Sequence, residues 1–464
     1  MAIKQVQVEV DSLVLGMYIS RLDRPWSQTP FTLQGFYLRS PREIIQLQNY
    51  CNHVFIDIQK GRAPLDSVAP PVTSSQQKNI QYQPLARSTA RIGAKAMKKN
   101  KEQTASAPIV VRKGFYETRT ALRKEAVQAK KIVGRLKGTL TLVVKQMGRG
   151  RTADYGRLKE SVGDMVESVL RCPDAFTWLM RLREQDERSY DHSLRSALWA
   201  VQFARYVGMP KDEIDVLCMG TLLKDIGKAK LSNRLLRKEN RSEAEESEYR
   251  KHVIYGVDLL RQTRQIEPRV ISVVRYQTER NDGSGYPEGL AGGKIPLLAR
   301  IAGIASTYDS ICYSRDGSEP LAPSRAVGVL YGMRDKQFSD DLVVGFIQSI
   351  GLYPTGTLVE LTTGDIGVVT EQHPKSRLTP KVAVLGREDA DLTAAVIVVD
   401  LKDDEKTRGA LGGKQDKGLI DRVAIARDLE PGGYDVDLSK IARLFITKEL
   451  GGSKGLFSGW LQRH

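Results

Sequence analysis

Two segments about fifty residues apart contain the side chains with the greatest capacity for chemistry. The first, residues 222–228, places Lys224 and Lys228 around the carboxylate of Asp225. If a helix runs through them, the two lysines are one turn apart and both face the side from which a phosphate can be bound. The second, residues 279–287, combines charged side chains with two glycines, a tyrosine and a proline. Glycine admits backbone conformations closed to other residues and proline stiffens the chain, which predicts a shaped loop.

Together these segments resemble the two signature segments of the HD-GYP family, metal-dependent phosphodiesterases of the bacterial second messenger cyclic di-GMP. The nine-residue run Glu279-Arg280-Asn281-Asp282-Gly283-Ser284-Gly285-Tyr286-Pro287 matches the family loop, at matching distances from Asp225-Ile226-Gly227-Lys228 and from Ala299-Arg300-Ile301. The resemblance covers roughly residues 180–370. It is fainter over residues 1–65, which resemble the uncharacterised domain often found ahead of HD-GYP domains. It implies a ligand-binding set of Lys228, Arg280, Asp282, Gly283, Gly285, Tyr286, Pro287 and Arg315, to which we add Lys224.

The same resemblance implies a metal site that this sequence has largely lost. The family ligands retained are His192, Asp225 and His252. Non-ligands stand at the other positions, namely Lys224 for the histidine of the HD pair, Gln277 and Thr278 for two histidines, and Ser306 for an aspartate. Phosphodiester hydrolysis of this kind needs clustered divalent cations, and these need several histidine and carboxylate ligands. We therefore expect no cofactor and no catalytic residues, with Fe or Mn in the relic site as the alternative.

Lys224 is interpreted as a substitute for the metal charge, because a fixed positive charge repels a cation. It pairs with Asp225 and offers charge to a ligand phosphate, or it merely fills space in a relic pocket. His192 and His252 are weak metal ligands or ordinary hydrogen-bonded core histidines. The other three histidines, His53, His373 and His464, lie outside the predicted bundle.

Three functions follow from these residues. The first is a non-catalytic module that binds cyclic di-GMP or signalling proteins such as diguanylate cyclases. The second is a cyclic di-GMP phosphodiesterase, a hydrolase, with an altered site. The third is a basic scaffold at nucleic acid or membrane, and a homo-oligomer is compatible with all three.

The basic scaffold hypothesis depends on an uneven distribution of charge. The net charge of the 464 residues is +16, and residues 83–151 hold 18 Lys or Arg against three Glu, a net +15. This segment is either a solvated linker followed by a helix with a basic outer face, or a surface that binds an anionic partner. Its apolar residues recur at helical intervals from 115 to 147, which predicts a helix there.

The fold class predicted is multidomain and mainly α. A small α+β domain (residues 1–75) precedes a flexible basic linker (76–112), a basic helix or helical linker (113–153) and an all-α HD-type helical bundle (154–350). A small β subdomain (351–402) and a mobile tail (403–464) follow.

The cysteines and the hydropathy pattern indicate the compartment. Four widely spaced cysteines predict reduced, buried thiols rather than disulfides or a zinc site. The N-terminus lacks a secretory pattern and no apolar run approaches the ~20 residues of a membrane span. We therefore expect a cytoplasmic protein.

Overall fold

The computed structural model of the chain forms two compact units, residues 1–103 and residues 104–464. The residues that the structure describes are 5–24, 36–38, 41–57, 115–149, 151, 153–181, 189–238, 240–263, 265–313, 320–373, 376–385, 397–411 and 422–430.

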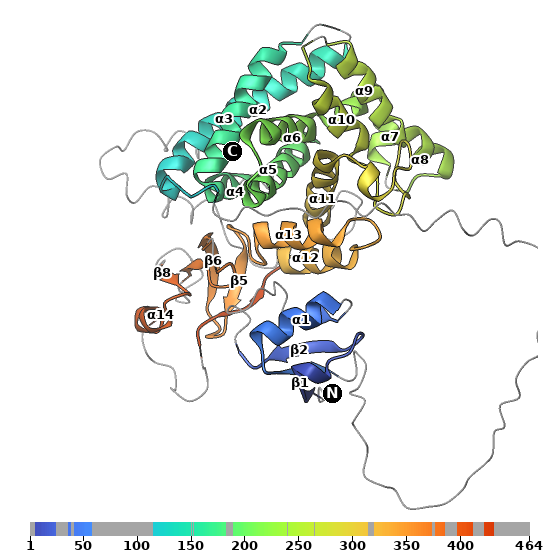
Figure 1. The fold of residues 1–464 in the computed structure, drawn as a ribbon. Helices are drawn as coiled ribbons and strands as arrows, with labels where there is room; N and C mark the ends of the chain where they lie inside the picture. Colours follow the sequence, from blue (N-terminus) through green and yellow to red (C-terminus); the bar gives the residue numbers. More distant parts are fainter. Residues whose placement is uncertain are drawn as a thin grey trace, which may run out of the picture. The chain divides into compact units, whose positions relative to one another are not determined.

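The first unit is a small α+β domain, as predicted. Its strands are β1 (Gln5–Glu9), β2 (Tyr18–Leu22), β3 (Phe36–Tyr37) and β4 (His53–Asp57), all paired antiparallel in the order β1-β4-β2-β3. Helix α1 (Pro41–Tyr50) lies against this sheet (Figure 1). Side chains alternate between the two faces of a strand, so Ile19, Val54 and Ile56 point to one side, where Met17 and Leu47 join them in a buried core.

The second unit consists mainly of a helical bundle (Figure 1). Its helices are α2 (Leu122–Gly148), α3 (Tyr155–Arg171), α4 (Pro173–Arg181), α5 (Ser189–Val207), α6 (Lys211–Leu223), α7 (Asn233–Arg237), α8 (Glu243–Arg250), α9 (His252–Arg261), α10 (Pro268–Tyr276), α11 (Leu297–Cys312), α12 (Pro323–Gly332) and α13 (Asp340–Ile350). The mainly helical fold class is confirmed.

Helices α5, α11 and α13 meet through aromatic side chains that pack edge to face inside the bundle. Trp199 and Tyr308 pack edge to face with ring centroids 5.4 Å apart, and Tyr308 packs in the same way on Phe346, also at 5.4 Å. All three side chains are buried. Such pairs fix the relative position of three helices, two of which carry residues of the candidate site.

The predicted basic helix is present as α2, but it is not a separate linker. Its apolar face, including Ile132, Leu136 and Leu140, is buried against the bundle. Beside this face, Lys137 Nζ lies 2.9 Å from an oxygen of Asp191, the residue before His192 on α5. The helix therefore belongs to the bundle, because apolar residues at helical spacing need a partner surface. Residues 83–114 of the basic segment lie outside the described residues, and its anionic partner stays a prediction.

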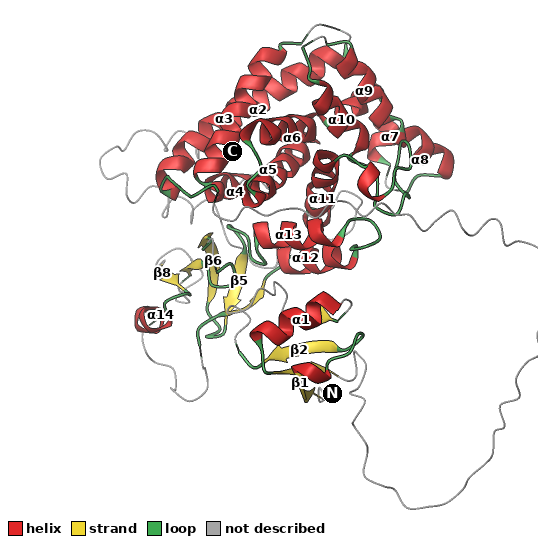
Figure 2. Cartoon of the chain, in the orientation of Figure 1, coloured by secondary structure: helices red, strands yellow, loops and turns green. Residues whose placement is uncertain are grey.

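A small antiparallel sheet follows the bundle (Figure 2). It consists of β5 (Leu358–Leu361), β6 (Ile366–Glu371), β7 (Lys381–Val384), β8 (Ile397–Asp400) and β9 (Ile425–Asp428), in the order β8-β7-β6-β5-β9. The structure extends this β subdomain past the predicted boundary at 402, because α14 (Asp404–Ala410) and β9 come from the predicted mobile tail. Strand β9 is too short to be distinguished by its own pattern, and pairing with β5 determines its structure.

All four cysteines are buried and none forms a disulfide, as predicted. Within the described ranges, no helix is both long and apolar enough to cross a bilayer.

Candidate functional site

A tight turn at the end of α6 positions the acidic residue of the candidate site. The helix ends at Leu223, and a 3₁₀ helix from Ile226 to Lys230 follows. Gly227 in this turn lies against α9, since a Cβ built on it would lie 1.9 Å from the carbonyl oxygen of His252. Only glycine permits this approach, which brings Asp225 and Lys228 beside His252.

Asp225 is held by two lysines. Its Oδ2 bonds to the ammonium of Lys224, and its Oδ1 lies 2.7 Å from the ammonium of Lys228. Burial alone raises the pKa of the Asp225 carboxyl, but the charges of Lys224 and Lys228 outweigh burial and hold that pKa well below its ordinary value. The expectation of one helix through both lysines is wrong, because α6 stops before Lys224. The two ammonium groups nevertheless converge, and they do so on the carboxylate between them.

The two lysines differ in exposure. The side chain of Lys224 is 2% exposed, whereas that of Lys228 is 17% exposed. A ligand arriving from solvent therefore reaches Lys228 directly, while Lys224 acts from behind Asp225.

His192, on α5, is fixed by a carboxylate that sequence reasoning missed. Its Nδ1 lies 2.7 Å from Oδ2 of Asp309 on α11, and its Nε2 lies 3.2 Å from the hydroxyl of Ser306. The other oxygen of Asp309 accepts from Arg195 at 2.9 Å and from the indole of Trp199 at 3.3 Å.

This network keeps both nitrogens of His192 occupied. With Nδ1 donating to Asp309, Nε2 is the acceptor for the Ser306 hydroxyl. Burial, with the charge of Lys224 adding to its effect and Asp309 opposing it, lowers the pKa of His192 to about 4. The imidazole is thus neutral at pH 7.

One sequence signal could have identified Asp309. It is an acidic residue within the apolar face of a predicted helix, and a carboxylate buried in that position needs a cationic partner.

His252 begins α9 and faces the glycine-rich loop. Its Nδ1 lies 2.7 Å from the carbonyl oxygen of Tyr249, and its ring lies 6.3 Å from that of Tyr286, edge to face. Burial lowers its pKa to about 4 as well, with Asp225 opposing the change and Lys228 adding to it. The structure therefore brings His192, Asp225, His252, Lys224 and Lys228 together.

Glu279 organises the loop of residues 279–287. Its two carboxylate oxygens accept from the backbone N–H groups of Glu288 at 2.7 Å and Leu290 at 2.9 Å. Gly285 lies so close to the backbone of Glu279 and Arg280 that an added Cβ would lie 2.4 Å from the Glu279 Cα and from the Arg280 backbone nitrogen. At the far end, the Thr278 hydroxyl donates to the carbonyl of Tyr286 at 2.7 Å, next to Pro287. The loop is thus closed by its own hydrogen bonds.

The predicted ligand-binding residues of the loop point in different directions. Tyr286 faces His252, and the guanidinium of Arg250 lies 5.1 Å from its ring centroid. Asp282 accepts from the backbone and hydroxyl of Ser284, and Gly283 has a φ of +82° that favours glycine.

Arg280 contacts the backbone around its own loop, and its role as a phosphate contact stays a prediction. Its Nη1 donates to the carbonyl of Glu279 at 2.9 Å and lies 3.4 Å from that of Gln277. Its guanidinium also lies 5.1 Å from the ring centroid of Phe338. Arg280 therefore supports the loop from inside. Arg315 lies outside the described residues.

The residues present do not fit a resident metal centre. Both oxygens of Asp225 face ammonium groups, His192 has both nitrogens hydrogen-bonded, and Gln277 and Thr278 supply no anionic donor. Within the described residues, no group of three or more histidine, cysteine, aspartate or glutamate side chains is arranged to hold an ion. A cation here would also experience two fixed positive charges.

The same charges suit an anion. Two ammonium groups and one carboxylate leave a net charge of +1, because both histidines are neutral at pH 7. Tyr286 adds a flat, partly exposed ring beside them. In such an arrangement the cation can bind a phosphate while the base attached to that phosphate packs on the aromatic ring.

Comparison with known proteins agrees with this organisation. Residues 5–158 match the family model described as "Domain of unknown function (DUF3391)", and residues 179–342 match that described as "HD domain". The DUF3391 match spans both compact units and includes α2.

Relatives are similar over different shares of the chain. A cyclic di-GMP phosphodiesterase of Pseudomonas aeruginosa is 29% identical over 85% of this chain and 88% of its own length. A cyclic di-GMP phosphodiesterase response regulator of Xanthomonas campestris is 33% identical over 29% of this chain and 36% of its own length. Among solved structures, an HD-GYP-type protein of Bdellovibrio bacteriovorus covers 74% of this chain and 98% of its own, at 14% identity and a TM-score of 0.42.

The chain is therefore an HD-domain protein. More narrowly, it belongs to the HD-GYP type in which a DUF3391 domain precedes the HD domain.

Proposed function

We propose that this chain is a cyclic di-GMP signalling protein whose HD domain binds the nucleotide without hydrolysing it. Two relatives named cyclic di-GMP phosphodiesterases, one of them similar over most of the chain, support the choice of nucleotide. The pairing of Asp225 with Lys224 and Lys228 supports binding rather than hydrolysis.

The pairing matters because of what hydrolysis demands. A phosphodiester is cleaved at such a site when metal ions generate a hydroxide and neutralise the charge that develops on the phosphate oxygens. Lysine ammonium groups provide the charge but hold no hydroxide. His192 and His252 are neutral and their Nδ1 atoms are committed to Asp309 and to the Tyr249 carbonyl. The residues present therefore favour holding a phosphate over attacking it.

Lys228 and Tyr286 make the direct contacts in this proposal. Lys228 is the more exposed lysine, and its ammonium lies 5.5 Å from the ring centroid of Tyr249. Lys224 contributes through charge, by neutralising Asp225 so that the carboxylate does not repel the ligand.

Calorimetric titration of the full chain with cyclic di-GMP, with and without EDTA, tests the proposal. We expect binding that survives EDTA and weakens as salt increases. Lys228→Ala is expected to weaken it about tenfold or more, through loss of one charge-assisted hydrogen bond. Lys224→His is expected to weaken it less and to restore no hydrolysis. Lys230→Ala is the matched control, since Lys230 is an exposed lysine in the same 3₁₀ helix. Binding that needs metal, or equal affinities in all variants, contradicts the proposal.

A phosphodiesterase with an altered site is the second candidate, favoured by the relative that shares 85% of the chain. Elemental analysis of protein purified without chelators and a hydrolysis assay separate the two functions. Binding without catalysis predicts well under one equivalent of Fe, Mn or Zn per chain and product formation equal to a buffer control. Two or more transition-metal ions, with turnover that disappears in Asp225→Asn, establish the enzyme instead.

A further inference from the structure

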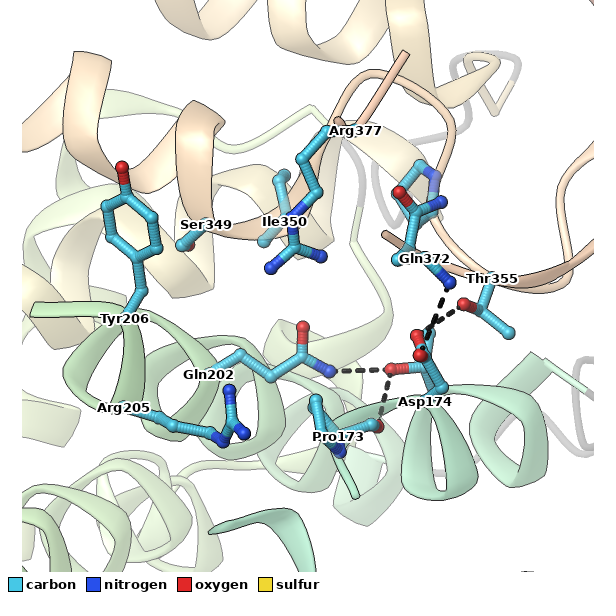
Figure 3. Close-up of a pocket in the computed structure, with 12 residues that line it drawn as sticks. Pro173, Asp174, Gln202, Arg205, Tyr206, Ser349, Ile350, Thr355, Gln372 and Arg377 are labelled. Atoms are coloured by element: carbon cyan, nitrogen blue, oxygen red, sulfur yellow. Dashed lines mark hydrogen bonds between the residues drawn. The ribbon is translucent and has the colours of Figure 1, made fainter. Parts of the chain in front are cut away.

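A second cluster of cations lies away from the HD site, where the bundle meets the β subdomain (Figure 3). The cluster surrounds about 350 Å³ of space, part of it open to solvent. Helices α4 and α5 line one side, and the end of α13 with residues 354–377 lines the other (Figure 3). The residues used below are Asp174, Arg205, Gln372 and Arg377.

Among the residues that the structure describes, Arg377 forms no ion pair with a carboxylate, although the charge of Asp174 acts on it. In Figure 3 its side chain extends from the β subdomain into the space above Gln202 and Arg205. Its Nε is shielded from solvent and has no hydrogen-bond partner among the described residues. Burial lowers the pKa of Arg377, against the effect of Asp174. A guanidinium N–H that is shielded from solvent and makes no hydrogen bond is costly unless another group fills the site.

Arg205 adds a second positive charge to the same space. Its Nε donates to the Leu170 carbonyl at 3.1 Å, and its Nη2 lies 3.4 Å from the Thr118 hydroxyl, so its described partners are all neutral. Burial lowers the pKa of Arg205, and Arg377 lowers it further. The two guanidinium groups therefore repel each other across the pocket.

The single carboxylate of the pocket is occupied by other groups. Oδ1 of Asp174 accepts from the Thr355 hydroxyl at 2.6 Å, and Oδ2 accepts from the backbone N–H of Gln372 at 3.3 Å (Figure 3). Burial raises the pKa of Asp174. At most one negative charge thus faces two positive charges, and neither oxygen bonds to a guanidinium in the contacts described.

Gln372 adds an unsatisfied acceptor. Its Oε1 is buried without a hydrogen-bond partner among the described residues, while its Nε2 donates to the Tyr353 carbonyl. A Cβ on Gly351 would lie 3.3 Å from this oxygen and 3.7 Å from the Cδ of Arg377, so both groups border the space that the glycine leaves open. The ligand required is one that accepts from Arg377 and donates to Gln372.

We propose that this pocket binds hydrogen phosphate, either free or as the terminal phosphoryl group of a mononucleotide. The unprotonated oxygens accept from Arg377 and face the charge of Arg205, and the P–OH group donates to Oε1 of Gln372. The ion thereby joins α5 of the bundle to the segment between β6 and β7. None of the residues that line the pocket belongs to the cluster around Asp225, which separates this site from the HD site.

Calorimetric titration of the full chain in a phosphate-free buffer at constant ionic strength tests the proposal. We expect one site for phosphate, weaker binding of sulfate, which lacks a donor at neutral pH, and no binding of chloride. Arg377→Gln is expected to weaken phosphate binding at least tenfold, and Arg377→Lys less. Arg427→Gln is the matched control, because Arg427 is an exposed arginine of the same subdomain that pairs with Glu360. Adenosine monophosphate replaces phosphate in a second series and distinguishes the two sources of the phosphoryl group.

Two further measurements test whether the variant is folded and whether phosphate binds at the HD site instead. Circular dichroism shows whether Arg377→Gln is folded, and Arg205→Lys provides a second variant if it is not. If Lys228→Gln loses phosphate affinity while Arg377→Gln retains it, the ion belongs to the HD site and the proposal is overturned. Absence of phosphate binding to the wild type, or equal binding in Arg377→Gln, overturns the proposal.

Discussion

The HD site and the pocket at the β subdomain each contain two cationic side chains and one partly buried carboxylate, yet they differ in how these groups pair. Both oxygens of Asp225 bond to ammonium groups. The two oxygens of Asp174 accept from a hydroxyl and a backbone N–H instead, and Nε of Arg377 is a shielded donor without a partner among the described residues. Equal formal charge thus produces a carboxylate that pairs with both cations in one place and a carboxylate that bonds to neither cation in the other. The hydrogen-bond partners of the cations, rather than the number of charges, therefore indicate which site is stabilised more by a bound anion.

The largest effect expected from this comparison is at Asp225. Asp225→Asn removes the charge that neutralises Lys224 and Lys228, and should lower the free energy of unfolding by about 3–5 kcal/mol, the cost of breaking a buried ion pair. Urea unfolding followed by circular dichroism measures it. Asp282→Asn is the control, because Asp282 is exposed and pairs locally with Ser284. Equal, small losses in both variants would mean that the Asp225 cluster contributes little to folding.

A smaller effect, of opposite sign in the two regions, is expected on removing one cation from each. Lys228→Gln loses a charge-assisted hydrogen bond to Asp225, so its free energy of unfolding should fall by about 1–2 kcal/mol. Arg377→Gln relieves repulsion with Arg205, so without phosphate its stability should be unchanged or higher by up to about 1 kcal/mol. Thermal unfolding of both variants in a phosphate-free buffer provides the comparison. A clear loss of stability in Arg377→Gln under these conditions would show that its charge is already compensated.

The smallest effect expected is a pH dependence that originates at Asp174. The folded-state pKa of Asp174 is raised above its ordinary 3.8 by burial, with Glu371 adding to the rise and Arg377 opposing it. Its contribution to stability is therefore fully present below pH 3.8 and is lost as pH rises through the raised folded-state pKa. Wild type should lose stability relative to Asp174→Asn over that interval, by at most about 1.4 kcal/mol per pH unit. Urea unfolding of both proteins from pH 4 to 8 measures the difference, and parallel curves would rule it out.

The sequence predicted the local features of the fold well. Apolar spacing in residues 115–147 predicted α2, and alternation in residues 357–361 and 366–370 predicted β5 and β6 to within a residue. These patterns are local because helix and strand periodicity depends only on near neighbours in the chain. Residues 404–410 and 425–428 were missed because α14 and β9 are short, and β9 depends on pairing with β5.

The sequence by itself determined which chemical groups are available, namely Lys224 in place of a histidine, no anionic donor at Gln277 and Thr278, and a glycine-rich loop before Pro287. Only the tertiary structure decided how those groups pair. It brought Asp309 to His192 across 117 residues of chain, turned Arg280 onto backbone carbonyls, and placed Arg377 over Arg205. The physical reason is that periodicity specifies which face of an element is buried, whereas the partner of a buried polar group depends on which faces pack together.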